Sequence, residues 1–232
     1  MRRLKIVVAV LGLIAIAANT AHPAFASPVS PKSGAEYTVL PSPQPVPATG
    51  KKIEVIEFFM YHCPACYAIE PELNAWVKAQ GERIVFRRIH VPHTGDNDPE
   101  AHLFLTLEAM QREDALHGKV EATWHVERRR LGSDADNLDW AVKNGIDREQ
   151  FLGVYNSFSV LAKLKSTGRL ASNYRVEGTP TLIVDGRYLT TPTMVDASNP
   201  GIARPDLARA TLQVVDVLVA NAQQAHRAAP AK

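Results

Sequence analysis

Cysteine is scarce in this sequence: among its 232 residues only Cys63 and Cys66 occur, separated by Pro64 and Ala65. Two cysteines cannot form the disulfide framework that holds many small exported domains together. A bridge that closes so short a loop removes little conformational entropy from the unfolded chain, so it would stabilise the protein little. The pair therefore indicates chemistry rather than structural support.

Long apolar segments are missing as well. The apolar run at residues 6–18 is too short to cross a membrane as a helix, which needs about 20 residues. Basic residues at positions 2, 3 and 5 precede this run, and residues 24–26 (Ala-Phe-Ala) follow it. This order is typical of a signal peptide cleaved near Ala26, and it predicts export.

A strong excess of one charge is also absent, because 26 Lys and Arg residues stand against 24 Asp and Glu residues. The one basic cluster, at residues 128–130, follows Glu127 and is interpreted as the solvated surface of a helix. We therefore expect no nucleic-acid partner. Hydrophobic residues make up 46% of the chain, which is enough for a packed core without disulfides.

The cysteines are expected at the junction of a strand and a helix. Residues 52–60 (KIEVIEFFM) are β-branched and aromatic, which predicts a mostly buried strand. Residues 64–79 carry apolar side chains at helical spacing, so Cys63 becomes the N-cap and Pro64 takes the first helical position. Residues 83–91 predict a second strand, parallel to the first.

A long segment without strand character follows. Its helical patterns divide into five predicted helices: 100–118, 119–130, 133–144, 147–158 and 159–173. Strand character returns at 180–184 and 187–190 around an Asp185-Gly186 turn, and a closing helix is expected over 205–223. This order predicts a sheet domain interrupted by a helical insertion.

The two cysteines should differ in acidity. Cys63 is expected at a helix N-terminus, where unpaired backbone N–H groups and the helix dipole favour an anion and lower the thiol pKa. Cys66, one turn further on, should be buried and less acidic. A metal site would use Cys63, Cys66 and His62, but tetrahedral sites need four ligands, and no second Cys or His cluster has matching spacing. We expect no metal and no cofactor.

Three segments resemble the DsbA family of periplasmic disulfide oxidants: residues 57–67 (EFFMYHCPACY), 155–158 (YNSF) and 176–188 (VEGTPTLIVDGRY). The resemblance runs from about Tyr37 to the closing helix. It implies an α/β protein, with a thioredoxin-like fold and an inserted all-helical domain. The expected organisation is a signal peptide (1–26), a Pro-rich leader (27–50), a thioredoxin-like domain (51–97 and 174–232) and a helical insertion (98–173).

The resemblance also implies roles for individual residues. Cys63 would be the reactive sulfur, Cys66 its partner, and Pro180 a cis proline that faces them. Glu57 matches a buried acidic residue that handles the proton of Cys66, although by itself the sequence favours a solvent-facing strand residue. The residues expected to contact substrate lie around the sulfurs: His62, Pro64, Ala65, Thr179 and Pro180.

One position departs from the family pattern. The best-known members carry a histidine where this chain has Ala65, and that histidine helps to stabilise the reactive thiolate. His62, just before Cys63, is a candidate substitute. The remaining histidines without an evident partner are interpreted as surface or packing residues: His90, His93, His102 and His117.

The function implied is a monomeric periplasmic oxidoreductase that introduces disulfides into unfolded exported proteins with free thiols. A quinone-linked, DsbB-like membrane oxidase would reoxidise the protein. Two alternatives stay open: a periplasmic disulfide reductase or isomerase of the same fold, and a non-enzymatic metal carrier that uses Cys63, Cys66 and His62. An isomerase of the DsbC kind would need a dimerisation domain, and the Pro-rich leader is too short to be one.

Overall fold

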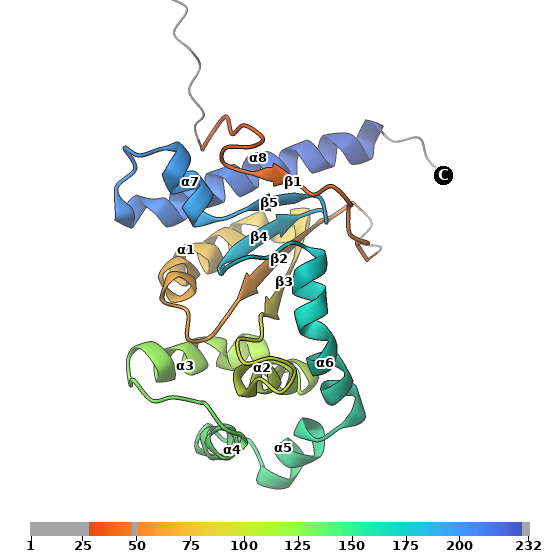
Figure 1. Ribbon diagram of the computed structural model, residues 1–232, viewed down its shortest axis with the longest axis vertical. Coiled ribbons are helices and arrows are strands. Elements are labelled where there is room, and N and C mark those ends of the chain that lie inside the picture. The colour runs from red at the N-terminus through yellow and green to blue at the C-terminus, as the bar shows by residue number, and fades with distance from the viewer. Residues whose placement is uncertain (1–27, 48–50, 229–232) are drawn as a thin grey trace, which may run out of the picture.

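The computed structural model describes residues 28–47 and 51–228 (Figure 1). The predicted signal peptide and its cleavage site near Ala26 lie outside the described residues. Within them a five-stranded sheet has the order β1-β5-β4-β2-β3. Its strands are β1 (Thr38–Val39), β2 (Ile53–Phe59), β3 (Ile84–His90), β4 (Thr181–Val184) and β5 (Tyr188–Thr190).

The central strand β2 is buried along its whole length, which explains its nearly continuous apolar sequence. It pairs in parallel with β3, as predicted, and antiparallel with β4. Because side chains alternate across a strand, Ile53 and Val55 join one core cluster while Ile56 and Phe58 join another. Glu57 therefore points to the same side of the sheet as Val55.

That side of the sheet is covered by α1 (Pro64–Gln80) and α8 (Leu207–Ala228), which pack against each other. A short helix, α7 (Pro192–Ser198), connects β5 to the residues before α8. The sequence analysis did not predict α7. The sequence does contain a local pattern for the start of α7. Thr191 is the N-cap, whose Oγ1 accepts a hydrogen bond from the Met194 N–H at 3.1 Å, and Pro192 takes the first helical position.

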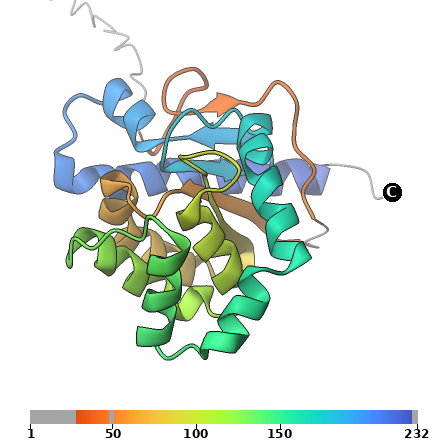
Figure 2. The same cartoon turned by 60° about the horizontal axis from the view of Figure 1, so that its bottom comes forward.

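Five helices lie between β3 and β4: α2 (Pro99–Ala109), α3 (Glu113–His125), α4 (Asp134–Lys143), α5 (Arg148–Tyr155) and α6 (Phe158–Asn173). Figures 1 and 2 show α2 to α5 gathered at one end of the sheet, with α6 returning alongside it. Their core cluster also contains Phe59, Tyr61, Cys63 and Cys66. The cysteines therefore lie where the helical segment meets the sheet. Among the described residues, no helix has the combination of length and hydropathy that would let it cross a membrane.

Two predicted helices in this segment have wrong boundaries. The first helix ends at Ala109 instead of residue 118, because Gln111 adopts a positive φ of 57° that breaks the helical path. The next helix, α3, then runs through Gly118, whose low helix propensity is outweighed by the burial of Leu116 and Val120. Residues 128–130 were predicted as helical and are not, since α3 ends at His125.

The other local signals are confirmed. Ser133 and Asp147 cap α4 and α5 by accepting hydrogen bonds from the N–H groups of residues three positions later. Asp185 and Gly186 have φ values of 54° and 59°, as a type I′ hairpin turn requires. A Cβ on Gly186 would lie 2.4 Å from the Gln44 carbonyl oxygen, so the leader leaves room for glycine only. The closing helix, predicted over 205–223, extends from Leu207 to Ala228.

Candidate active site

The first turn of α1 holds both cysteines. Cys63 is the N-cap residue and Pro64 the first helical residue, as the sequence predicts. Cys63 Sγ accepts a hydrogen bond from the Cys66 N–H at 3.3 Å, and its thiol donates to the Thr179 carbonyl oxygen at 3.4 Å. Both thiols are free; Cys63 is 7% exposed and Cys66 1% exposed. The pair is thus reduced, and the sulfur of Cys63 has contacts outside its own helix.

The surroundings make the two thiols unequal acids. A hydrogen bond from the Cys66 thiol, with further help from the backbone N–H groups of Cys66 and Ala65, lowers the pKa of Cys63 to about 5 although burial opposes this. The same hydrogen bond to Cys63, together with burial, raises the pKa of Cys66. The order of acidity is the predicted one, and its main causes are the hydrogen bond between the two thiols and the burial of Cys66, to which the backbone N–H groups at the helix end add.

The segment before β4 faces Cys63. The Thr179–Pro180 peptide bond is cis, as expected from the family resemblance. Thr179 supplies the carbonyl oxygen next to Cys63 Sγ, and its own hydroxyl is buried without a hydrogen-bond partner. Thr181 Oγ1 donates to the Gly178 carbonyl at 2.7 Å, which fixes the turn that leads into β4.

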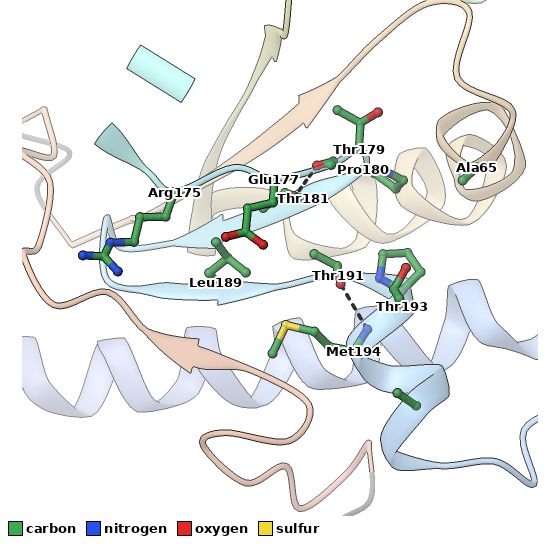
Figure 3. A pocket seen from close by; sticks show the side chains of 13 residues that line it. Ala65, Arg175, Glu177, Thr179, Pro180, Thr181, Leu189, Thr191, Thr193 and Met194 are labelled. Atoms are coloured by element: carbon green, nitrogen blue, oxygen red, sulfur yellow. Dashed lines mark hydrogen bonds between the residues drawn. The ribbon is translucent and has the colours of Figure 1, made fainter. Parts of the chain in front are cut away.

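A groove of about 460 Å³ is lined by Ala65, which lies between the two cysteines in the chain, and by Thr179 and Pro180 (Figure 3). One wall carries Ala65, at the end of α1, and Pro180; the other is formed by β5 and the first turn of α7. The lining is mostly apolar, with Leu189 and Met194 among its residues, and Glu177 adds a charge. Of the residues expected to contact substrate, the groove brings together Ala65, Thr179 and Pro180.

His62 lies apart from that groove. Its backbone N–H donates to Glu100 Oε2 at 3.0 Å, and its ring Nδ1 lies 2.8 Å from Glu100 Oε1. Glu100 belongs to the first turn of α2 and was not identified from the sequence. No local pattern could have identified it, because the two residues are 38 positions apart.

Glu57 is buried, with 1% of its surface exposed, so the solvent-facing interpretation is wrong. Its Oε2 accepts a hydrogen bond from Arg88 Nε at 3.1 Å, whereas Oε1 has no partner. Burial raises the pKa of Glu57 to about 7, although the guanidinium of Arg88 acts in the opposite direction. Glu57 in turn raises the pKa of Cys66, which places its charge close to the buried sulfur.

Glu57 is one member of a buried charged cluster, which consists of Glu57, Glu70, Arg88, Glu113, His117 and Glu121. Arg88 Nη2 lies 2.8 Å from Glu70 Oε1, and His117 Nδ1 lies 2.9 Å from Glu113 Oε1. Burial alone would lower the pKa of His117, but its carboxylate neighbours raise it well above the usual value. The sequence analysis treated His117 as a packing residue; the spacing of Glu113, His117 and Glu121, four residues apart on one helix, was the signal available.

Part of this cluster has the composition of a metal site. In the described part of the chain, the group of side chains close enough to share one ion is Glu70, His117 and Glu121. It does not include the Cys63, Cys66 and His62 of the metal-carrier alternative. The guanidinium of Arg88 already donates a hydrogen bond to the Glu70 carboxylate. Arg88 therefore balances the negative charge that would otherwise attract a metal ion.

A Cys-X-X-Cys pair that caps the helix after the central strand, and that faces a cis proline at the start of a neighbouring strand, defines a thiol:disulfide oxidoreductase with a thioredoxin-like fold. Residues 96–208 match the family described as DSBA-like thioredoxin domain. The chain is 38% identical over 200 residues to the thiol:disulfide interchange protein DsbA of Burkholderia cepacia, covering 86% of this chain and 90% of that one. It is 36% identical over 212 residues to the DsbA of Bordetella pertussis, covering 91% and 96%.

A solved structure agrees with these relatives. The crystal structure of Pseudomonas aeruginosa DsbA superposes with a TM-score of 0.74 at 33% sequence identity, covering 84% of this chain and 96% of that one. This chain therefore belongs to the DsbA family of thiol:disulfide interchange proteins and is a disulfide-introducing oxidoreductase. The predicted fold class, a thioredoxin-like α/β fold with an inserted helical domain, is confirmed.

Proposed function

We propose that Cys63 is the sulfur that exchanges with substrates and that Cys66 is the sulfur that leaves and returns. The observation that carries this assignment is the position of Cys63 Sγ, at the end of α1, within reach of the Thr179 carbonyl and beside the groove. Cys66 is 1% exposed and packed inside the core, so a substrate cannot reach it first.

The reaction begins with the Cys63–Cys66 disulfide. A substrate thiolate attacks the sulfur of Cys63, the bond to Cys66 breaks, and Cys66 leaves with the electron pair and takes up a proton. A second thiolate of the substrate then attacks the substrate sulfur of this mixed disulfide and expels Cys63 as a thiolate. Two electrons have passed from the substrate to the protein, and the substrate keeps the new disulfide.

The neighbouring residues have distinct roles in this proposal. Glu57 handles the proton of Cys66, because it is buried, its charge acts on that thiol, and its pKa of about 7 lets it hold or release a proton near neutral pH. Pro180 has no N–H, so it offers no hydrogen-bond donor of its own to the sulfur of Cys63, which contacts the Thr179 carbonyl beside it. Ala65 lines the groove that a substrate meets, whereas Pro64 and His62 would contact substrate beside Cys63, outside that groove.

Substrates are unfolded or partly folded exported proteins with free thiols. The mostly apolar groove favours extended chain segments without a strict sequence requirement. Reoxidation by a quinone-linked, DsbB-like membrane oxidase removes the two electrons. The protein acts in the periplasm as a monomer after cleavage of the signal peptide near Ala26.

The test is oxidative refolding of a reduced substrate protein, combined with the redox equilibrium of the Cys63–Cys66 pair in glutathione buffers. We expect the oxidised protein to introduce disulfides stoichiometrically and to be more oxidising than glutathione. A pair that stays oxidised in strongly reducing buffer would overturn the proposal and favour the reductase alternative.

A further inference from the structure

The residue before the reactive cysteine is held by a carboxylate from another part of the chain. Glu100 accepts the backbone N–H of His62 at 3.0 Å, and both of its oxygens lie within 2.9 Å of His62 Nδ1. A carboxylate only accepts hydrogen bonds, so Nδ1 carries a proton. The two contacts fix the main chain and the ring of His62 together, directly beside Cys63.

The position of Glu100 favours its ionised form. It lies in the first turn of α2, after the N-cap Asp98 and Pro99, where the helix dipole stabilises a negative charge. Its side chain is 11% exposed. Burial would raise the pKa of Glu100, but the hydrogen bonds and charges of His62 and His90 together outweigh burial and lower it to about 2.

The ring of His62 is enclosed but not buried, with 28% of its side chain exposed. The rings of His93 and Trp124 lie 5.2 and 5.8 Å from it, centroid to centroid. Hydrogen bonding to Glu100 raises the pKa of His62 against the effect of burial, with smaller contributions from Asp98 and Cys63. The other titratable group next to Glu100 is His90, whose Nε2 accepts the Tyr61 N–H at 3.1 Å.

We propose that Glu100 is a positioning residue for disulfide exchange, which holds His62 as a cation beside Cys63 and thereby stabilises the reduced form of the protein. The inference rests on the proposed role of Cys63 as the exchanging sulfur. A cation next to a thiolate lowers its free energy, and stabilising the reduced form raises the reduction potential. Glu100 does not touch the sulfurs, so its effect passes through the imidazolium of His62.

The two possible routes for the effect of Glu100 have opposite signs. If Glu100 acts through His62, replacing it with glutamine lets the imidazole lose its proton, and the Cys63 thiolate loses a stabilising cation. If Glu100 acts directly on Cys63, the same substitution removes a nearby negative charge and stabilises the thiolate. Glu100→Gln keeps an oxygen that can accept the His62 N–H, so it changes the charge while preserving the shape.

The experiment measures the equilibrium of the Cys63–Cys66 pair with glutathione and the pH titration of the Cys63 thiolate absorbance. Four variants of the full chain are compared with the parent: Glu100→Gln, His62→Gln, the double variant, and Glu108→Gln. Glu108→Gln is the matched control, since Glu108 lies on the same helix and pairs at the surface with Lys163 at 3.0 Å.

We expect Glu100→Gln and His62→Gln each to weaken the oxidising equilibrium by about tenfold, which equals about 30 mV for a two-electron couple. The pKa of Cys63 should rise in both variants, and the imidazole pKa of His62, followed by NMR, should fall in Glu100→Gln. The double variant should match His62→Gln alone. Glu108→Gln should match the parent protein.

Several results would overturn the inference. They are a stronger oxidising equilibrium in Glu100→Gln, an unchanged equilibrium in His62→Gln, and additive effects in the double variant. If Glu100→Gln does not fold, the result for His62→Gln decides whether the inference holds, because that variant removes the cation without a substitution in α2. A parent protein that does not exchange with glutathione contradicts the proposed function instead, so the two failures are distinguishable.

Discussion

The two sulfurs of the active site lie one helical turn apart, yet they face different kinds of surroundings. On the side of Cys63 lie the helix end, the Thr179 carbonyl, a groove and the His62–Glu100 pair. On the side of Cys66 lies the largely buried charged cluster around Arg88. The first environment favours an anion, and the second holds a sulfur neutral beside a carboxyl group.

Under the assignment proposed above, this difference lets one dithiol perform two tasks. A leaving group must be stable as a thiolate, and Cys63 meets that need through its position at the end of α1. A sulfur that regenerates the disulfide must remain protected until it is needed, and Cys66 meets that need through burial. Neither property belongs to the Cys-X-X-Cys motif itself; both arise from the elements that surround it.

The largest expected effect separates the roles of the two sulfurs. Cys63→Ser should reduce oxidative refolding to the uncatalysed background, because no exchanging sulfur remains. Cys66→Ser should also stop turnover, but it should form stable mixed disulfides with substrate thiols through Cys63. Non-reducing gels of periplasmic extract distinguish the two variants. Trapped partners on Cys63→Ser, and none on Cys66→Ser, would reverse the assignment.

The second prediction concerns acidity. Because the pKa of Cys63 is lowered to about 5, its alkylation rate should rise with pH around pH 5 and be nearly constant above pH 6. An ordinary cysteine, with a pKa of about 8.5, is less than about 1% ionised at pH 6 and reacts slowly. Mass spectrometry of the reduced protein after brief iodoacetamide treatment at pH 6 should find the label on Cys63. A label on Cys66, or equal labelling of both cysteines, would contradict the predicted difference in acidity between them.

Much of the Cys63 side could be predicted from the sequence, because its signals are local. A β-branched and aromatic strand followed at once by Cys-Pro fixes β2, the N-cap and the start of α1. The Asp185-Gly186 turn identifies the hairpin, which together with the family resemblance places Pro180 opposite the cysteines. The strand, the helix start and the hairpin depend on residues that are neighbours along the chain, whereas the placement of Pro180 opposite the cysteines rests on the family resemblance.

The charged partners could not be predicted in the same way. Glu57 contacts Arg88, 31 positions later, and His62 contacts Glu100, 38 positions later. Such pairs depend on how α2 and β3 pack beside the active site, and no periodic pattern reports this. A charged residue in a strand also suggests solvent exposure unless its partner is known, which is why Glu57 was ambiguous. The α2–α3 break at Gln111 was missed because a non-glycine residue with positive φ has no reliable sequence signal.

The third prediction concerns Glu57 in the buried charged cluster and is tested by the free energy of unfolding. A folded-state pKa of about 7 for Glu57 means that the native protein keeps a proton that the unfolded chain loses near pH 4.3. The contribution of Glu57 to the free energy of unfolding should therefore fall as pH rises from about 4.5 to 7. Glu57→Gln should remove this loss, making the reduced variant about 3 to 4 kcal/mol more stable at pH 8 and little changed at pH 4.

Urea unfolding of the reduced proteins at both pH values measures the effect of Glu57→Gln. Arg88 keeps Glu70 as a partner in the variant, at 2.8 Å, so no buried charge is left without a counterion. Glu72→Gln, on the exposed side of α1, changes the same formal charge and should leave the pH dependence as it is. A variant less stable than the parent at pH 8 would show that the ion pair with Arg88 outweighs the desolvation of Glu57.

The smallest expected effect is a change in reduction potential caused by a substitution at Ala65, which is exposed at the rim of the groove. Ala65→His places a second imidazole within reach of Cys63, and a partly exposed charge-assisted hydrogen bond contributes about 1.5 kcal/mol. That corresponds to a rise in reduction potential of about 30 mV, measured in glutathione buffers. The pKa of Cys63 should fall in the same variant, since both changes follow from a more stable thiolate.

The background in which this substitution is made then decides what His62 contributes. If Glu100 holds His62 as a cation, a second cation at position 65 meets like-charge repulsion, and part of the possible gain is lost. Ala65→His should then raise the potential more when it is combined with His62→Gln than when it is made alone. Equal gains in both backgrounds would mean that Cys63 senses no charge on His62. The acidity of Cys63 would then owe nothing to His62. The difference in pKa between Cys63 and Cys66 would come only from the hydrogen bond between the two thiols, the position of Cys63 at the helix terminus and the burial of Cys66 in the first turn.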